Sequence, residues 1–362
     1  MKFTLNWLFI FAPIAAWLHY TGGNPALVFV FSALAIVPSA GLMGEATEHL
    51  SSKVGQGIGG LLNATFGNMA ELIIAGMALH KGMIEVVKAS LTGSIIGNLL
   101  LVMGVSIFAG GSKYKSLRFN VQATRSMITT LTLASVSLII PTVFHFAADK
   151  THQWTPVLEQ KLSLFIALII FGSYLSMLWF SLKTHRPLFS GAGDAMDSEE
   201  QAHGHKPWSM KRCVWTLVGA TGVVAVLSEY LVGSVESARS AFGLTEVFVG
   251  VVVVAIIGNA AEHSTAVMMA LKNKMDLAAG IAIGSSIQIA MFVAPVLVFL
   301  SYAFGRPMDM EFSLAEVASV VAAVHVTAQV CNDGESNWFE GLQLLAVYLV
   351  IGVLFFFLPG GH

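Results

Sequence analysis

Long apolar segments follow one another through most of this chain and leave little room for any other kind of fold. A helix needs about 20 predominantly apolar residues to cross the hydrocarbon core of a bilayer. Charged residues make up 11% of the chain, whereas a soluble domain has about 25%. We therefore predict an all-α polytopic membrane protein with about eleven transmembrane helices. They are expected at roughly residues 3–20, 25–48, 56–79, 84–109, 123–147, 157–182, 211–237, 246–271, 276–304, 313–331 and 338–358.

The connections predict how the chain is oriented and divided. Lys and Arg are more frequent in the loops on the side of the N-terminus, which predicts a cytoplasmic N-terminus. Residues 185–210 form a polar, acidic connection near the midpoint, expected on the same side. It suits either a solvated linker or a segment for cation sensing or gating, through Asp194, Asp197, Glu199, Glu200, His203 and His205. The net charge of −2 gives no indication of nucleic-acid binding, and the isolated Cys213 and Cys331 are expected to be packing residues.

Two distant stretches of the chain match without a gap. The first begins at Phe66 and reads FGNMAELIIAGMALHKGMIEVVKASLTGS; the second begins at Ile257, 191 residues later, and reads IGNAAEHSTAVMMALKNKMDLAAGIAIGS. The same offset relates Glu45 to Glu236. We predict an extra N-terminal helix in residues 1–24 and two repeats of five helices, in residues 25–184 and 211–362. Because five is odd, the second repeat enters the membrane upside down, an inverted-topology arrangement found in many secondary transporters.

This duplication puts one carboxylate near the middle of a predicted span in each half. An ionised side chain at that depth costs roughly 2.5–3.5 kcal/mol or more, and no cationic residue lies within one helical turn of Glu71 or Glu262. The inversion is expected to bring the two acids together, and two close carboxylates stay ionised only with a cation between them. We therefore expect the pair to bind either a metal ion or protons. A permanently protonated, structural pair is the alternative.

Small polar residues surround both acids. Asn68 and Asn259 each precede a glutamate by three residues and share its helix face. Gly67 and Gly258 are expected to loosen their helices and free backbone carbonyls. Neighbouring spans offer further oxygens, from Ser94, Asn98, Ser285, Ser286 and Gln288. Calcium takes about 6–8 oxygen ligands, amide and backbone carbonyls included, so this set suits a hard cation. Helix packing alone is the other reading of the small residues.

The motifs GNMAE and GNAAEH, each followed by a Gly-Ser segment, resemble the two alpha-repeats of the calcium/cation:proton antiporter family, within the cation/calcium exchanger superfamily. GEATEHL and SEYLVGSVE resemble its gating helices, and SNWFEGLQLLAVYLVIGVLFFFLP resembles its final helix. The resemblance covers almost the whole chain. It implies that Glu71 and Glu262 are the central ion-binding carboxylates. It also implies that Asn68, Asn259, Ser94, Ser285 and Gln288 line the site.

The resemblance also suggests roles beyond the central pair. His263 directly follows the second glutamate and is a candidate proton relay, since histidine titrates near neutral pH; a structural histidine is the alternative. The first repeat has Leu72 at that position, so the halves are not equivalent. The acids on the spans before the motif helices are candidates for gating or ion access, with ordinary helix-end charges as the alternative: Glu45, Glu48, Glu229 and Glu236.

We therefore expect a Ca²⁺/H⁺ antiporter in a lipid bilayer, with no cofactor beyond the transported ions. A sodium-coupled or broad-specificity cation exchanger is the nearest alternative, and a cation channel is a more distant one. No HExxH or GxSxG motif indicates an enzyme. A chain of this kind suits a prokaryotic plasma membrane, with a vacuolar membrane as the alternative. It is also compatible with a homo-oligomer.

Overall fold

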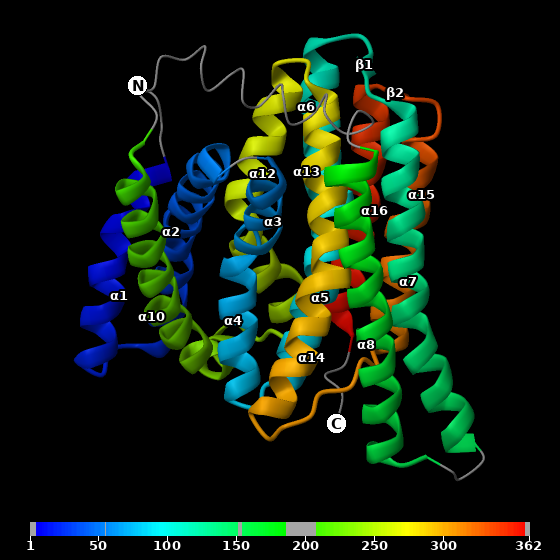
Figure 1. The fold of residues 1–362 in the computed structure, drawn as a ribbon. Coiled ribbons are helices and arrows are strands. Elements are labelled where there is room, and N and C mark those ends of the chain that lie inside the picture. The colour runs from blue at the N-terminus through cyan, green and yellow to red at the C-terminus, as the bar shows by residue number, and fades with distance from the viewer. Residues whose placement is uncertain (1–4, 55, 151–153, 186–207, 359–362) are drawn as a thin grey trace.

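Helices account for nearly all of the computed structural model, which describes residues 5–54, 56–150, 154–185 and 208–358 (Figure 1). Its α-helices are α1 (Phe11–Tyr20), α2 (Pro25–Val54), α3 (Gln56–Phe66), α4 (Met69–His80), α5 (Ile84–Ile96), α6 (Met103–Lys113), α7 (Val121–Lys150), α8 (Pro156–Trp179), α10 (Met210–Phe242), α11 (Glu246–Phe248), α12 (Ala255–Leu271), α13 (Met275–Gln288), α14 (Ala294–Ala303), α15 (Leu314–Val330) and α16 (Trp338–Phe357). Two short strands, β1 (Leu117–Arg118) and β2 (Glu335–Ser336), pair antiparallel. The acidic residues of the predicted connection, Asp194 to His205, lie outside the described residues.

The prediction of an all-α polytopic membrane protein is confirmed, but its span count is not. Among the described residues, eight helices are long and apolar enough to cross a membrane. The other three predicted spans are broken or short. Span 56–79 is divided into α3 and α4, α15 has 17 residues, and the N-terminal segment joins a 3₁₀ turn (Leu5–Ile10) to the ten-residue α1. Eleven spans therefore stays a prediction.

The outer surface of the bundle is apolar, as a lipid environment requires. Ile169 on α8 is 67% exposed, Trp215 on α10 is 73% exposed, and Val350 on α16 is 69% exposed. A soluble protein rarely exposes contiguous apolar surface on this scale. These faces are therefore expected to contact acyl chains.

Two long helical segments form the centre of the bundle. In the most apolar stretch of Ile84–Lys113, 83% of residues are buried, and in that of Met275–Ala303 the value is 67%. In Pro156–Thr184, at the periphery, it is only 22%. Both central segments contain a π-helical stretch, at Gly97–Val102 and Ile289–Val293. Such stretches are rare and are frequent at functional sites.

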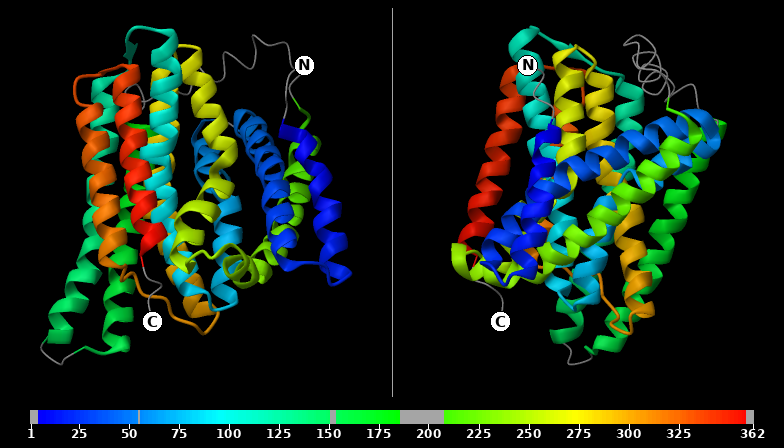
Figure 2. Two further views of the ribbon diagram at one scale, coloured as in Figure 1. Left: turned by 180° about the vertical axis from the view of Figure 1, so that it is seen from behind. Right: turned by 90° about the vertical axis from the view of Figure 1, so that its left-hand side faces the viewer.

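The remaining helices flank this centre on two sides. On one side α2 and α10 pack along each other, with α1 against α2; on the other lie α7, α8, α15 and α16 (Figures 1 and 2). Between them, α2 also contacts α12, and α10 contacts α4. These two contacts connect the outlying pair α2 and α10 to the helices that carry Glu262 and Glu71.

Candidate functional site

Glu71 lies in the first turn of a helix that begins in the interior of the bundle. Between α3 and α4 the chain makes a turn at Gly67 and Asn68. The Gly67 N–H donates to the Asn63 carbonyl (2.9 Å) at the end of α3. Glycine is a poor helix former, and asparagine favours the position before a helix. The break leaves backbone N–H groups of the first turn of α4 without helical partners. A negative charge on Glu71 is favoured there, because the N-terminal end of a helix carries partial positive charge.

Glu262 lies in a continuous helix, so the two halves of the site are built differently. The predicted loosening is found at Gly67 and is wrong for Gly258, since α12 is unbroken from Ala255 to Leu271. Gly258 has another role in the structure. A Cβ atom at Gly258 would lie 3.2 Å from the Cγ of Glu71, so the missing side chain leaves space for that glutamate.

Polar side chains from the two halves of the chain are hydrogen-bonded to each other. The Asn68 side-chain amide donates to Oε1 of Gln288, and the Ser285 hydroxyl lies 3.5 Å from Oδ1 of Asn68. In the opposite sense, Nδ2 of Asn259 donates to the Ser94 hydroxyl (3.1 Å). Nδ2 of Asn98, in the π-helical stretch after α5, donates to Ser285 (3.1 Å). The structure thus brings the predicted amide and hydroxyl residues together in two buried groups, one at Asn68 and one at Asn259. Ser286 is the exception, because its hydroxyl donates to the Ala282 carbonyl of its own helix.

Four buried polar atoms at these groups have no hydrogen-bond partner among the described residues. They are Oε2 of Glu71, Oε2 of Glu262, Oδ1 of Asn259 and Nε2 of His263. The two carboxylates are close enough to repel each other electrostatically, and Ser285 donates a hydrogen bond to Glu262. An unpaired buried acceptor is costly. Three such oxygens are therefore suited to a bound cation or to protons.

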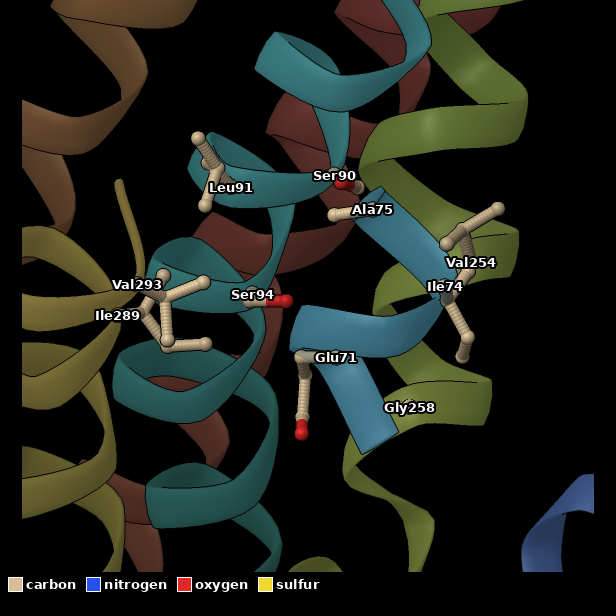
Figure 3. Close-up of a pocket in the computed structure, with 10 residues that line it drawn as sticks. All are labelled: Glu71, Ile74, Ala75, Ser90, Leu91, Ser94, Val254, Gly258, Ile289 and Val293. Carbon is tan, nitrogen blue, oxygen red and sulfur yellow. The ribbon is translucent and has the colours of Figure 1, made fainter. Parts of the chain in front are cut away.

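A small cavity of about 20 Å³, enough for about one water molecule, adjoins Glu71. It is bordered by α4, α5 and the two helices of the second half that face them, and it is largely apolar apart from Ser90, Ser94 and Glu71. Figure 3 shows Glu71 and Ser94 side by side, with Ser90 and Leu91 further along α5. In the described part of the chain, no three His, Cys, Asp or Glu side chains gather into a metal cluster. A cation here would depend on the two carboxylates and on amide, hydroxyl and backbone oxygens, which are ligands of hard cations.

Comparison with known proteins identifies the family. Residues 24–183 and 213–357 match the family described as sodium/calcium exchanger protein. The chain belongs to this family. The two matched blocks nearly coincide with the two predicted repeats, 25–184 and 211–362, although the duplication itself stays a prediction.

Within the exchanger family the chain groups with calcium/proton antiporters. It is 45% identical to the Ca²⁺/H⁺ antiporter of Synechocystis, over 97% of this chain and 96% of that protein. It is 46% identical to the Ca²⁺/H⁺ antiporter ChaA of Bacillus subtilis, over 92% and 93% of the two chains. The native YfkE structure matches with a TM-score of 0.82 and 41% identity, covering 97% of this chain and all of that one. The H⁺/Ca²⁺ exchanger CAX, at 14% identity and a TM-score of 0.73, covers 99% of this chain and 92% of its own and shares the fold.

The gating candidates of this exchanger lie on α2 and α10, away from the central network. Glu45 is exposed and Glu48 is half-buried on α2, which reaches α12 where Gly41 faces Ala261. On α10, Glu229 and Glu236 are exposed. Glu236 pairs with Arg239 (2.6 Å), and the Glu229 backbone carbonyl accepts a hydrogen bond from Lys81 (3.2 Å). The structure therefore places these acids on helices that touch the site helices and not in the site.

The exchanger also contains a buried cation that the sequence analysis did not predict. Lys88 on α5 is 4% exposed, and its Nζ lies 2.6 Å from Asp309 and 3.8 Å from Glu311 and from Glu85. Burial raises the pKa of the Glu311 carboxyl, and Lys88 opposes that shift. The contacts attach α5, which carries Ser94, to the connection between α14 and α15. The sequence did contain a signal for this cluster. A lysine within a predicted membrane span, such as Lys88, requires an acidic partner in the fold.

Proposed function

We propose that this chain is an antiporter that exchanges Ca²⁺ for H⁺ by alternating access, with Glu71 and Glu262 as the ion-binding groups. The observation that carries the proposal is the set of three buried acceptor oxygens, on Glu71, Glu262 and Asn259, that have no donor in the described part of the chain. The relatives named as Ca²⁺/H⁺ antiporters match the chain over nearly its whole length. The function is therefore transport, and no covalent step is required of the protein.

The coupling follows from competition for the same carboxylates. When neither ion is bound, two neighbouring carboxylates in a low-dielectric interior repel each other and lack solvation. A Ca²⁺ ion removes both penalties, and so do protons. Since the pair cannot hold its full complement of both at once, Ca²⁺ expels protons and protons expel Ca²⁺. The oxygens of Asn68 and Asn259 are the additional ligands that this chain offers to the cation.

An inverted duplication is supported by helix positions and by hydrogen bonds. The 191-residue offset carries the central segment Ile84–Lys113 onto Met275–Ala303, and it carries the π-helical stretch Gly97–Val102 onto Ile289–Val293 within one residue. The same offset relates two contacts between the halves of the site. It relates the contact of Asn68 with Ser285 to the contact of Asn259 with Ser94.

The packing around these equivalent positions is unequal, which supports alternating access. A Cβ at Gly93 would overlap the Val251 backbone, so α5 and the π-helical stretch Val249–Val254 are in backbone contact. The offset relates Gly93 to Gly284 and Val251 to Gly60. Gly284 instead faces the Met127 methyl at 3.5 Å, and Gly60 faces the Leu182 side chain. The helices are therefore in backbone contact at the crossing of Gly93 with Val251, and they are not at the equivalent crossing of Gly284 with Gly60. In the exchange cycle, the first crossing would open while the second one closes.

The gating and orientation assignments extend the same proposal. The helices α2 and α10 touch α12 and α4, so their movement would open or close the paths to Glu262 and Glu71. His263, whose Nε2 is buried without a partner among the described residues, is the candidate proton relay. We place the N-terminus in the cytoplasm and the protein in a prokaryotic plasma membrane, in keeping with bacterial relatives from Synechocystis and Bacillus subtilis.

Calcium uptake by proteoliposomes tests this function. With an acidic lumen and no sodium, the wild-type protein should accumulate Ca²⁺, and Glu71→Gln or Glu262→Gln should abolish uptake while the protein remains folded. Glu335→Gln is the matched control, because that carboxylate is exposed and outside the spans. Uptake that requires a sodium gradient would favour the sodium-coupled alternative. Uptake that runs down a Ca²⁺ gradient without proton counterflow would favour a channel.

A further inference from the structure

One face of α7 changes from polar to apolar along its length. The exposed residues of this face recur every three or four positions, as a helix requires: Arg125, Thr129, Thr132, Val136, Ile140 and Val143. Val136 is 46% exposed and Val143 is 55% exposed. The polar end is the one from which α7 begins, at the top of Figure 1. The preceding helix α6 ends with Lys113 just before it. Along this face, Arg125 is thus followed by a stripe of exposed apolar side chains.

A groove of about 410 Å³ lies at this polar end, between α7 and α15. Its lining comes from both helices and the turn after α15: Arg125, Ile128, Thr129, Thr132, Ala328, Gln329, Cys331 and Asn332. Arg125 is the one charged side chain in this lining. The exposed amides of Gln329 and Asn332 face it from the second wall. On α15 the exposed Val321 follows below them and extends the apolar character of the wall.

Arg125 has no ion-pair partner among the residues that the structure describes. Two other cations at this end of the molecule are engaged: Arg118 pairs with Glu335 (2.9 Å), and Lys113 donates to the Leu271 carbonyl (3.0 Å). A guanidinium offers a planar fork of donors that matches the oxygens of a phosphate. The free cation, the adjacent amides and the apolar stripe together have the polarity profile of a phospholipid.

We propose that this groove binds an anionic phospholipid. The lipid phosphate lies on Arg125, the amides of Gln329 and Asn332 complete its hydrogen bonds, and one acyl chain follows Val136 and Ile140 along α7. Basic pockets between transmembrane helices on the cytoplasmic side are suited to anionic headgroups. The Lys- and Arg-rich end of this chain is the one expected on that side. The site is separate from Glu71 and Glu262, and its existence does not depend on the transported ion.

Lipid retention by the intact protein tests the proposal. Full-length protein is reconstituted with equal amounts of phosphatidylglycerol and phosphatidylcholine, extracted in mild detergent, and weighed with its bound lipid by native mass spectrometry. Arg125→Gln should lower phosphatidylglycerol retention about fivefold, the effect of one basic side chain at an anionic lipid surface. Phosphatidylcholine retention should not change. Lys150→Gln is the matched control, because Lys150 is an exposed cation at the opposite end of the same helix.

Other outcomes would overturn the proposal. Equal phosphatidylglycerol retention by Arg125→Gln and wild type would do so, and so would an equal loss in Lys150→Gln. A lower oligomer mass in Arg125→Gln with unchanged lipid retention would mean that a second copy of the chain covers the groove. Thermal stabilisation of delipidated protein by inorganic phosphate as strong as that by phosphatidylglycerol would mean that the acyl chain contributes nothing. Wild-type melting temperature in Arg125→Gln verifies that the variant is folded.

Discussion

The contact between Gly93 and Val251 gives the sharpest prediction of this structure. Replacing Gly93 by alanine puts a methyl group into the backbone of Val251. Backbone cannot rotate away as a flexible side chain does, so the two helices must separate. Overpacking of this kind costs about 1–3 kcal/mol. Since every 1.4 kcal/mol is tenfold in an equilibrium constant, the described arrangement should become about 5 to 150 times less populated relative to competing states.

Two further glycines on the same central segments provide the controls. Nothing lies within 4 Å of a Cβ at Gly97, so Gly97→Ala gains the same helix propensity without a clash. Gly284→Ala meets only the flexible Met127 methyl at 3.5 Å. Unfolding by urea or dodecyl sulfate, followed by tryptophan fluorescence, should therefore place Gly93→Ala about 1–3 kcal/mol below both controls.

Transport assays of the same variants distinguish an effect on stability from an effect on the transport cycle. If the cycle closes the crossing at Gly284 and residue 60, then Gly284→Ala should retain stability and lose much of its Ca²⁺ uptake. Gly97→Ala should retain both properties. Equal stability of Gly93→Ala and Gly97→Ala would refute the assignment of a backbone contact. Normal uptake by Gly284→Ala would refute the exchange of the two crossings.

Two other substitutions test the network and the buried cation. Asn259→Ala removes the donor to Ser94 and should cost about 1–3 kcal/mol of stability and weaken Ca²⁺ binding; Asn63→Ala, an exposed amide on α3, is the control, and a similar loss in both would contradict the role of the network. Lys88→Met leaves Asp309, Glu311 and Glu85 without their shared cation, and should cost about 1–3 kcal/mol, between the values for exposed and buried ion pairs. Lys161→Met, which removes an exposed lysine, should be neutral in the same unfolding assay, and a neutral Lys88→Met would argue against the cluster.

The sequence predicted the helices well because apolar length and the gapless repeat are local signals. It also predicted which polar residues meet, since the 191-residue offset relates Asn68 to Asn259 and Ser94 to Ser285. The offset did not predict where the halves differ. Gly67 and Gly258 are equivalent by sequence, yet the chain breaks at Gly67 and continues as a helix through Gly258.

What the sequence could not give depends on contacts between distant residues. The ion pair of Lys88 with Asp309 joins positions more than two hundred residues apart, and the repeat gives no signal of it, because the offset relates Lys88 to Ala279. The groove at Arg125 exists only because α7 and α15 lie next to each other. The contact of Gly93 with Val251 likewise depends on how the two halves pack against each other, which no local pattern records.

Proton release on Ca²⁺ binding tests the central claim most directly. Purified protein in weakly buffered detergent solution is titrated with Ca²⁺ while the change in pH is recorded. The account predicts that wild-type protein releases protons as it binds Ca²⁺, at most one from each of the two carboxyls, and that the double variant Glu71→Gln/Glu262→Gln releases none. Calcium binding without any proton release by the wild-type protein, or unchanged release by the double variant, would contradict it.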